Sequence, residues 1–206
     1  MFGKKIYILL VAVVMGVMSV AAADSAEVVM KRAASRINNA GGISASFCID
    51  SGSQRISGTL KALGNKFALQ TSASSTWYDG KQMWTYNSNN RETTLMLPTA
   101  AEVAEANPLS IVNTYGSSFT ASFAKTQVKG CKTIVLTPKS KKLGYKSVHV
   151  TIPDSSSLPS KIVIVPTSGQ RITVSVTKAE TGRSFAASTF VYPAAKYPKV
   201  EIVDLR

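Results

Sequence analysis

The sequence predicts a mainly β protein with helices (α+β), in which an antiparallel sheet curls into a sandwich or a barrel. Two observations carry this prediction. Short runs of alternating apolar and polar residues recur at near-regular spacing and are separated by turn residues. Segments with helical spacing precede the first of these runs and interrupt the middle of the series.

Residues 1–23 have the layout of a secretory signal peptide. Lys4 and Lys5 precede the apolar run 6–17, and small residues at 21–23 stand before Asp24. We expect cleavage there and export, which leaves residues 24–206 as one domain. The whole chain carries a charge of +13, and removal of the two leader lysines leaves +11. Export excludes nucleic acid as the partner and favours an anionic lipid or an acidic protein.

One amphipathic helix is expected over residues 24–40. Its apolar residues recur at helical spacing, namely Ala26, Val29, Met30, Ala33 and Ile37. Asp24 and Glu27 are placed like a capping box, and Gly41-Gly42 provides the stop.

Strands with one apolar face follow this helix. The alternating apolar positions are Ala45, Phe47 and Ile49, then Phe67 and Leu69, then Leu95 and Leu97, and later the runs 148–152 and 172–176. Turn residues at 79–80, 87–90, 153–154 and 168–169 separate them.

The middle of the chain breaks the strand pattern. Residues 99–106 and 108–115 are expected to form two short helices, with Pro108 at a first turn. The second carries the apolar residues Leu109, Ile111, Val112 and Tyr115. A helical insert of this kind could plug one mouth of a barrel.

Side chains that carry catalysis or hold metals are sparse. The single histidine, His149, lies on the strand face opposite Val148 and Val150 and is expected at the surface. The carboxylates are scattered, and no zinc, haem or phosphate-cradling motif occurs in the sequence. The sequence therefore favours a binding protein with no cofactor and no metal over an enzyme.

Two questions stay open at the level of residue pattern. Cys48 and Cys131 form either one disulfide, as export favours, or two unpaired thiols. The apolar strand faces enclose either a lumen for hydrocarbon chains or a solid core, and pattern alone favours the solid core.

The segment 77–87 carries the most specific motif. Asp79-Gly80 supplies a tight turn between two strands, and Trp84 and Tyr86 point to one face. This segment resembles the "DGK-x-hydrophobic-W-x-Y" hairpin of the LolA family of lipoprotein carriers. The resemblance continues in the helices after Pro98, in Leu136-Thr137-Pro138-Lys139, and in a C-terminal run that contains Phe190, Pro193, Val200, Ile202 and Asp204.

The resemblance implies an incomplete antiparallel β-barrel of about eleven strands with a helical lid. It also implies a monomeric periplasmic carrier that takes acylated lipoproteins from an inner-membrane ABC transporter complex to an outer-membrane acceptor. The residues implied to line the lipid cavity are Phe47, Ile49, Leu60, Phe67, Leu69, Trp84, Leu95 and Leu97. The residues implied on the inner side of the lid are Leu109, Ile111, Val112 and Tyr115.

The sequence departs from the family at one position. Members often hold the lid with an arginine bonded to helix backbone, and this chain has Leu63-Gly64-Asn65 at the matching place. Arg55 or Lys61 could substitute, although both fit solvated strand positions better. Two other functions stay open, a LolA-like paralogue that carries another amphiphile and a regulatory protein that senses lipoprotein.

Overall fold

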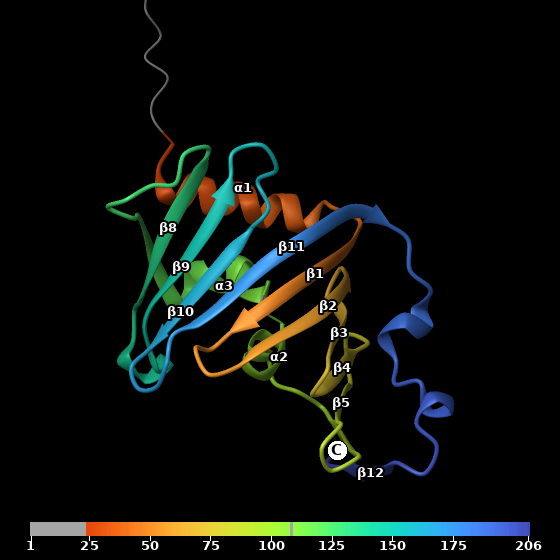
Figure 1. Cartoon of the computed structure of the whole chain (residues 1–206). Coiled ribbons are helices and arrows are strands. Elements are labelled where there is room, and N and C mark those ends of the chain that lie inside the picture. Colours follow the sequence, from red (N-terminus) through yellow and green to blue (C-terminus); the bar gives the residue numbers. More distant parts are fainter. Residues whose placement is uncertain (1–23, 108) are drawn as a thin grey trace, which may run out of the picture.

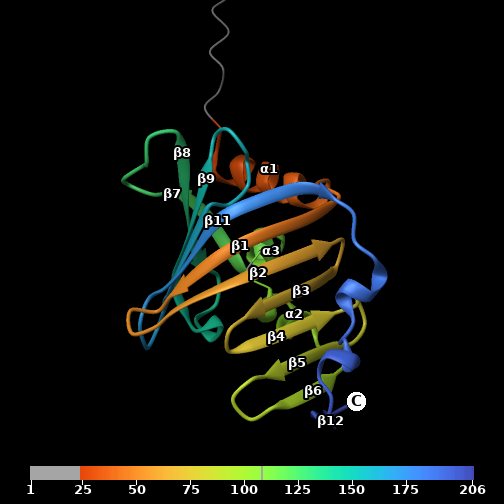
Figure 2. The same ribbon diagram turned by 45° about the vertical axis from the view of Figure 1, so that its right-hand side comes forward.

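The computed structural model describes residues 24–107 and 109–206, and in it a single twelve-stranded sheet curls around three helices (Figure 1, Figure 2). The helices are α1 (Ala26–Asn38), α2 (Ala100–Ala106) and α3 (Ser110–Ser118). The strands are β1 (Gly42–Asp50), β2 (Arg55–Leu63), β3 (Lys66–Thr71), β4 (Ser74–Tyr78), β5 (Met83–Asn87), β6 (Glu92–Met96), β7 (Phe119–Phe123), β8 (Cys131–Pro138), β9 (Tyr145–Pro153), β10 (Lys161–Pro166), β11 (Ile172–Arg183) and β12 (Glu201–Asp204). The expected signal peptide, residues 1–23, lies outside the described residues.

The sheet is an incomplete barrel. Its strand order is β12-β6-β5-β4-β3-β2-β1-β11-β10-β9-β8-β7, and within the described residues the two end strands do not pair with each other. All neighbouring strands are antiparallel except β12, which is parallel to β6. The predicted fold class is therefore confirmed, with β1 to β11 as the antiparallel barrel and β12 as an added edge strand.

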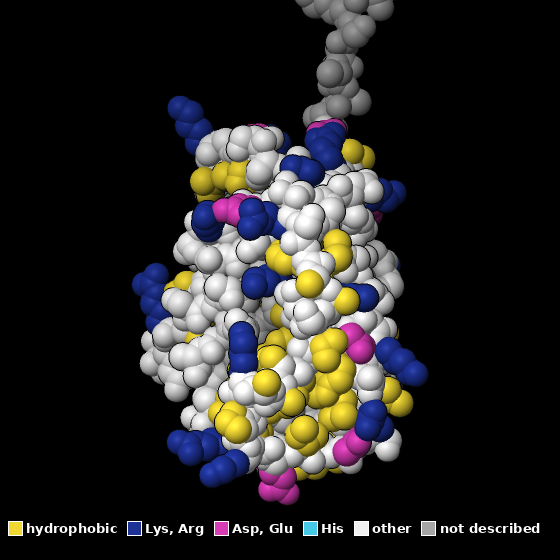
Figure 3. Space-filling model, turned by 90° about the vertical axis from the view of Figure 1, so that its right-hand side faces the viewer, with side chains coloured by type: hydrophobic (Ala, Val, Ile, Leu, Met, Phe, Trp, Pro, Cys, Tyr) yellow, Lys and Arg dark blue, Asp and Glu magenta, His cyan; other side chains and the backbone are white. Residues whose placement is uncertain are grey.

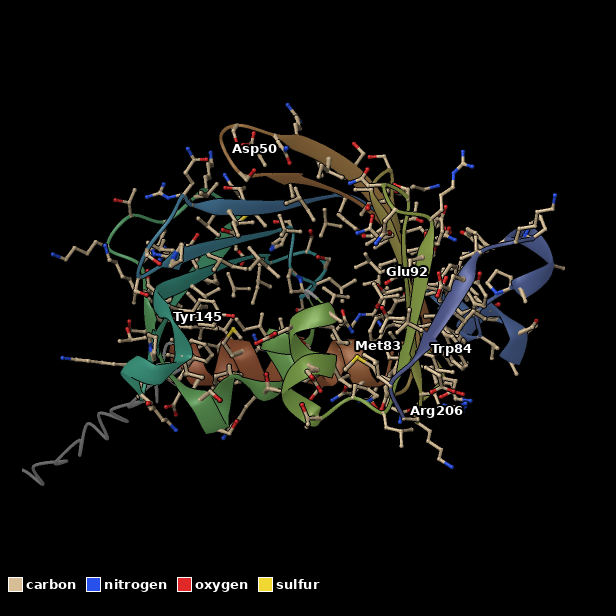
Figure 4. All side chains as sticks on the ribbon, turned by 90° about the horizontal axis from the view of Figure 1, so that it is seen from below. Asp50, Met83, Trp84, Glu92, Tyr145 and Arg206 are labelled. Atoms are coloured by element: carbon tan, nitrogen blue, oxygen red, sulfur yellow. The ribbon has the colours of Figure 1, made fainter. Side chains whose placement is uncertain are left out.

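The three helices close the side that the sheet leaves open. Seen from below, the sheet forms an arch, and the helices lie across its opening (Figure 4). An arch of this kind exposes its inner face unless another element covers it, and the helices supply that cover.

Helix α1 forms where the apolar spacing predicts it, but its cap differs from the prediction. The Ser25 hydroxyl accepts a hydrogen bond from Val28 N at 3.2 Å and is the N-cap. Asp24 instead accepts from Arg32 Nη1 at 2.8 Å, and this hydrogen-bonded ion pair lowers the pKa of the Asp24 carboxyl. The expected capping box of Asp24 and Glu27 is wrong, because Ser25 takes the N-cap position and the Asp24 carboxylate is bonded to Arg32 instead.

The main core lies inside the arch. The buried face of α1, with Val29, Met30 and Ala33, lies against β7, β8 and α3 and belongs to one cluster with inward residues of β1 to β3 and of β8 to β11. The largest fully buried side chains there include Phe67, Ile134 and Leu136. This core joins the early and late strands because β1 pairs with both β2 and β11.

A second apolar cluster covers the outer face of β3 to β5. After β11 the chain crosses that face as residues 184–200 and then returns as β12. Tyr192 and Tyr197 meet the ring of Trp77 edge-on, at centroid distances of 5.5 Å and 5.7 Å. Figure 3 views this side and shows that apolar side chains gather on its lower half. The C-terminal segment thus acts as a strap, which we define as residues 184–204.

Candidate functional site

The lid consists of α2 and α3, which follow β6 in the chain. Helix α2 begins with a capping box, in which Glu102 N donates to the Thr99 hydroxyl at 3.3 Å and Thr99 N donates to the Glu102 carboxylate at 2.7 Å. The two hydrogen bonds from Thr99 lower the pKa of Glu102. This closed cap fixes where the chain leaves the sheet and enters the lid.

The inner side of α3 packs onto the main core. Val112 is fully buried, and the Tyr115 hydroxyl donates to the carbonyl of Glu27 on α1 at 3.3 Å. Burial, and to a lesser degree the Glu27 charge, raises the pKa of Tyr115. Leu109 and Ile111 pack against the same cluster. The four residues predicted on the inner side of the lid therefore all contact the interior.

The end of α3 is held by a lysine from the sheet. The Lys139 ammonium donates to the carbonyl of Gly116 at 2.6 Å, and Lys139 N donates to the carbonyl of Ser118 at 2.9 Å. Helix C-termini leave carbonyl groups without intrahelical partners, and a cation there is favourable. Lys139 thus joins the end of β8 to the end of the lid.

A partly enclosed cavity of about 420 Å³ lies between the lid, β7 and the start of β9. Its apolar wall includes Ile111, Phe119, Leu143 and Tyr145, and Phe119 and Tyr145 place their ring centroids 6.3 Å apart. Polar groups lie along the other wall, with Ser117 and Ser118 at the end of α3 and Glu105 on α2. The cavity is therefore amphipathic.

Five of the eight predicted cavity residues face the interior. Phe47, Leu60, Phe67 and Leu69 belong to the main core, and Ile49 packs against it. They belong to the same buried cluster as the inner face of α1, and the cavity beside α3 is lined by other residues.

The other three predicted cavity residues lie elsewhere. Trp84 packs in the outer cluster under the strap. Leu95 is cross-strand partner to Trp84 and therefore shares its outer face. Leu97 is 53 % exposed, beside Lys81 and Arg206. These assignments are wrong because alternation places residues on a common face without saying which face is inside.

Sequence reasoning missed the inner residues of the same strands. Tyr78, Met83 and Met96 pack against the main core, and Figure 4 shows Met83 pointing into the arch while Trp84 points away from it. The strand register shows which residues face inward. Tyr78 pairs with Phe67 and with Met83, and cross-strand partners share one face of the sheet.

The two cysteines are free thiols in the structure. Cys48 is on β1 and Cys131 begins β8, so that β11, β10 and β9 lie between them. At the usual strand spacing this separation is roughly 15–20 Å, whereas a disulfide needs Cα atoms within about 7 Å. The disulfide alternative is therefore excluded by the sheet order.

The described residues contain no cluster of His, Cys, Asp or Glu that could hold a metal ion. Among the described helices, none is both long and apolar enough to span a bilayer. His149 is half-buried on β9, with its Nε2 3.1 Å from the Ser147 hydroxyl. Of the three larger hollows that the described residues form, the lid cavity is more enclosed than those beside Phe47 and beside Arg206.

The sequence matches the family model of the outer membrane lipoprotein carrier protein LolA over residues 17–170. The chain belongs to the LolA family. No curated protein matches it significantly. An uncharacterized conserved protein from Thermus thermophilus has a similar structure, with a TM-score of 0.60 and 12 % identity over 87 % of this chain and 98 % of that one.

Two further solved structures are more distant. A LolA superfamily protein from Nitrosomonas europaea has a TM-score of 0.42 and 10 % identity over 84 % of this chain and 100 % of that one. A putative outer membrane lipoprotein-sorting protein domain from Vibrio parahaemolyticus has a TM-score of 0.46 and 10 % identity over 81 % of this chain and 95 % of that one. At such identities the likeness to the Thermus protein shows the fold alone.

The basic residues considered as substitutes for the family arginine do not reach the lid of this LolA-family chain. Arg55 Nε donates to Cys48 Sγ at 3.0 Å. Lys61 is exposed and pairs with Ala68, which belongs to the outer cluster. Lys139, the last residue of the LTPK motif, is the basic residue that bonds to lid backbone. The motif was visible in the sequence, but its contact with α3 depends on the tertiary fold.

Proposed function

We propose that this protein is a non-enzymatic periplasmic carrier that holds the acyl chains of lipoproteins behind its lid. It accepts them from an inner-membrane ABC transporter complex and delivers them to an outer-membrane acceptor. The observation that carries the proposal is the apolar interior of an open barrel, closed by helices rather than by strands, with a cavity beside the lid helix α3. Membership of the LolA family supports the same function.

The size of the cavity indicates how loading proceeds. Its volume of about 420 Å³ is within the range of small-ligand sites, roughly 300–1,000 Å³, and suits one chain better than three. The space behind α3 is filled by Val112 and Tyr115 from the lid itself. Cargo with several chains therefore has to displace α3 from the core.

The energetics explain both the need for a carrier and its release of cargo. Burying hydrocarbon gains about 0.8 kcal/mol per methylene, so a sixteen-carbon chain in water costs on the order of 12 kcal/mol. In the empty protein the lid packs its own apolar side chains into the interior. This packing competes with cargo, lowers the net affinity and permits release.

The test is native mass spectrometry of protein from the periplasm, followed by uptake of a purified triacylated lipoprotein. We expect a lipoprotein adduct with the wild type and loss of uptake with Ile111→Asp, in the cavity wall. The matched control is Ile202→Asp, at a 46 % exposed position on β12, which should take up cargo normally. A wild-type protein that neither carries nor accepts lipid would refute the carrier function.

A further inference from the structure

One end of the lid cavity, which we call its mouth, lies near a lysine that is not itself among the lining residues. The Lys139 ammonium lies next to the cavity, because its acceptor, Gly116, directly precedes the cavity residues Ser117 and Ser118. Lys141, which is exposed, stands two residues before Leu143, another cavity residue. The hydroxyls of Ser117 and Ser118, 3.4 Å apart, lie at this same end.

We propose that this mouth binds an anionic headgroup, phosphate or carboxylate, of an acyl lipid whose chain occupies the cavity. The inference rests on the acyl-binding cavity of the proposed carrier function, and it adds an anionic acyl lipid as a second ligand class beside lipoproteins. An ammonium and the Ser118 hydroxyl donate hydrogen bonds to anionic oxygens, whereas the Ser117 hydroxyl already donates to the Thr114 carbonyl at 2.8 Å. Bonds to a charged acceptor are stronger than bonds to a carbonyl. The wall formed by Ile111, Phe119 and Tyr145 takes the chain.

The proposal has a consequence for the lid. An ammonium has three donors, and the bond to Gly116 uses one of them. An anionic headgroup competes with the Gly116 carbonyl for the ammonium and weakens the tie between β8 and α3. Headgroup recognition thereby favours lid opening, because the ligand interacts better with the open state than with the closed one.

The charges around the mouth limit how strongly it can attract an anion. Glu105, on α2, is the acidic group among the residues that line the cavity, and its charge opposes that of Lys139 in anion binding. Lys139 is exposed, so the attraction is screened by salt and should be strongest at low ionic strength.

The experiment compares two lipids with the same palmitoyl chain, anionic lysophosphatidylglycerol and zwitterionic lysophosphatidylcholine, below their micelle concentrations. With wild-type protein at low salt we expect the anionic lipid to bind about tenfold more tightly. Lys139→Gln removes the charge and should reduce the preference to about twofold. Because the substitution also alters the tie to Gly116, the readout is the ratio of the two lipid affinities rather than either affinity alone. Lys139→Arg should retain the preference.

The controls separate this inference from the carrier function. Lys161→Gln, an exposed lysine on the outer side of β10, should behave as wild type. Equal affinity of the wild type for both lipids, or a preference that Lys139→Gln leaves intact, would overturn the headgroup site while the carrier function stands. Binding of neither lipid, together with no lipoprotein uptake, would overturn both.

Two further arms cover a folding defect and the source of the anion. If Lys139→Gln does not fold, the wild-type protein alone tests the headgroup site. Its preference for the anionic lipid should disappear in 0.5 M salt. A preference that persists there would contradict the charge mechanism. Free glycerol 3-phosphate should not compete at millimolar concentration. Competition at that level would mean that the mouth binds phosphate without a chain and would overturn the lipid assignment.

Discussion

The sheet has two apolar faces, and they are covered in different ways. The inner face meets three helices, and the lid among them is tied at its end by a few hydrogen bonds, such as those from Lys139 to Gly116 and Ser118. The outer face of β3 to β5 meets the strap, which packs aromatic rings edge-on and continues into a strand of the same sheet. A cavity lies beside the lid.

This contrast separates a binding surface from a structural one. The strap is anchored by β12, whose residues pair with β6 from Glu201 to Asp204, so releasing it means breaking a strand pairing. The lid can leave the core by breaking a few bonds at its ends and exposing Val112 and Tyr115. Substitutions on the outer face should therefore change stability, whereas substitutions on the inner face should change binding.

The largest expected effect is on the outer face. Trp77→Ala removes a 3 % exposed ring that contacts Tyr192 and Tyr197 and should lower the free energy of unfolding by about 3–5 kcal/mol. Urea denaturation measures this change. The neighbouring Tyr78→Ala faces the interior and should cost less stability but reduce lipid uptake. Reduced uptake by folded Trp77→Ala would contradict the division between the faces.

The next effect concerns the lid. Val112→Asp places a carboxylate on the inner side of the lid, at a position that is fully buried in the core and that faces the acyl chains when cargo is bound, so the charge opposes burial against either. Lipid affinity should fall a hundredfold or more, about 3 kcal/mol, while the sheet stays folded by circular dichroism. Asn113→Asp adds the same charge at the adjacent exposed position and should retain wild-type affinity. Normal uptake by Val112→Asp would remove α3 from the binding site.

Much of the fold could be predicted because alternation and turn residues are local signals. The strands around Phe47, Phe67 and Val174, and the Asp79-Gly80 hairpin, lie where the pattern places them. In that hairpin the Asp79 carboxylate accepts from the backbone N–H groups of Lys81 and Gln82, both at 2.8 Å. Such local bonds are encoded within a few residues.

The candidate site was less predictable because both faces of β4 to β6 carry large apolar residues. Met83 faces inward and Trp84 outward, and alternation alone treats the two choices alike. The deciding element, the strap with Tyr192 and Tyr197, lies about a hundred residues later in the chain. Which face it covers is a tertiary property.

A smaller effect is expected at the rim of the inner face. Gly58 pairs with Phe47 across β1 and β2, and an added Cβ would lie 2.4 Å from Phe47 Cζ and 2.6 Å from the Gln70 carbonyl. Because the carbonyl belongs to a paired strand, Gly58→Ala should destabilise by about 1–3 kcal/mol. Gly116→Ala, in α3 with open space around it, should instead stabilise by about 0.5–1 kcal/mol. Thermal unfolding measures both changes in stability. A higher unfolding temperature for both variants would contradict the close packing at Gly58.

The smallest effect is expected where the strap ends. Hydrogen bonds and charge from Arg206 lower the pKa of Asp204 from 3.8 to about 2, and Arg206 Nε donates to Asp204 Oδ1 at 2.9 Å. A lowered folded-state pKa means that the ionised carboxylate contributes stability above pH 3.8 and loses that contribution as the pH falls toward 2. Because both side chains are largely exposed, Asp204→Asn should lower the unfolding temperature only slightly at pH 7, and the difference from wild type should vanish near pH 2. A difference that persists at pH 2 would mean that Asp204 holds the strap through its shape and neutral hydrogen bonds, and that the outer face does not depend on this charge.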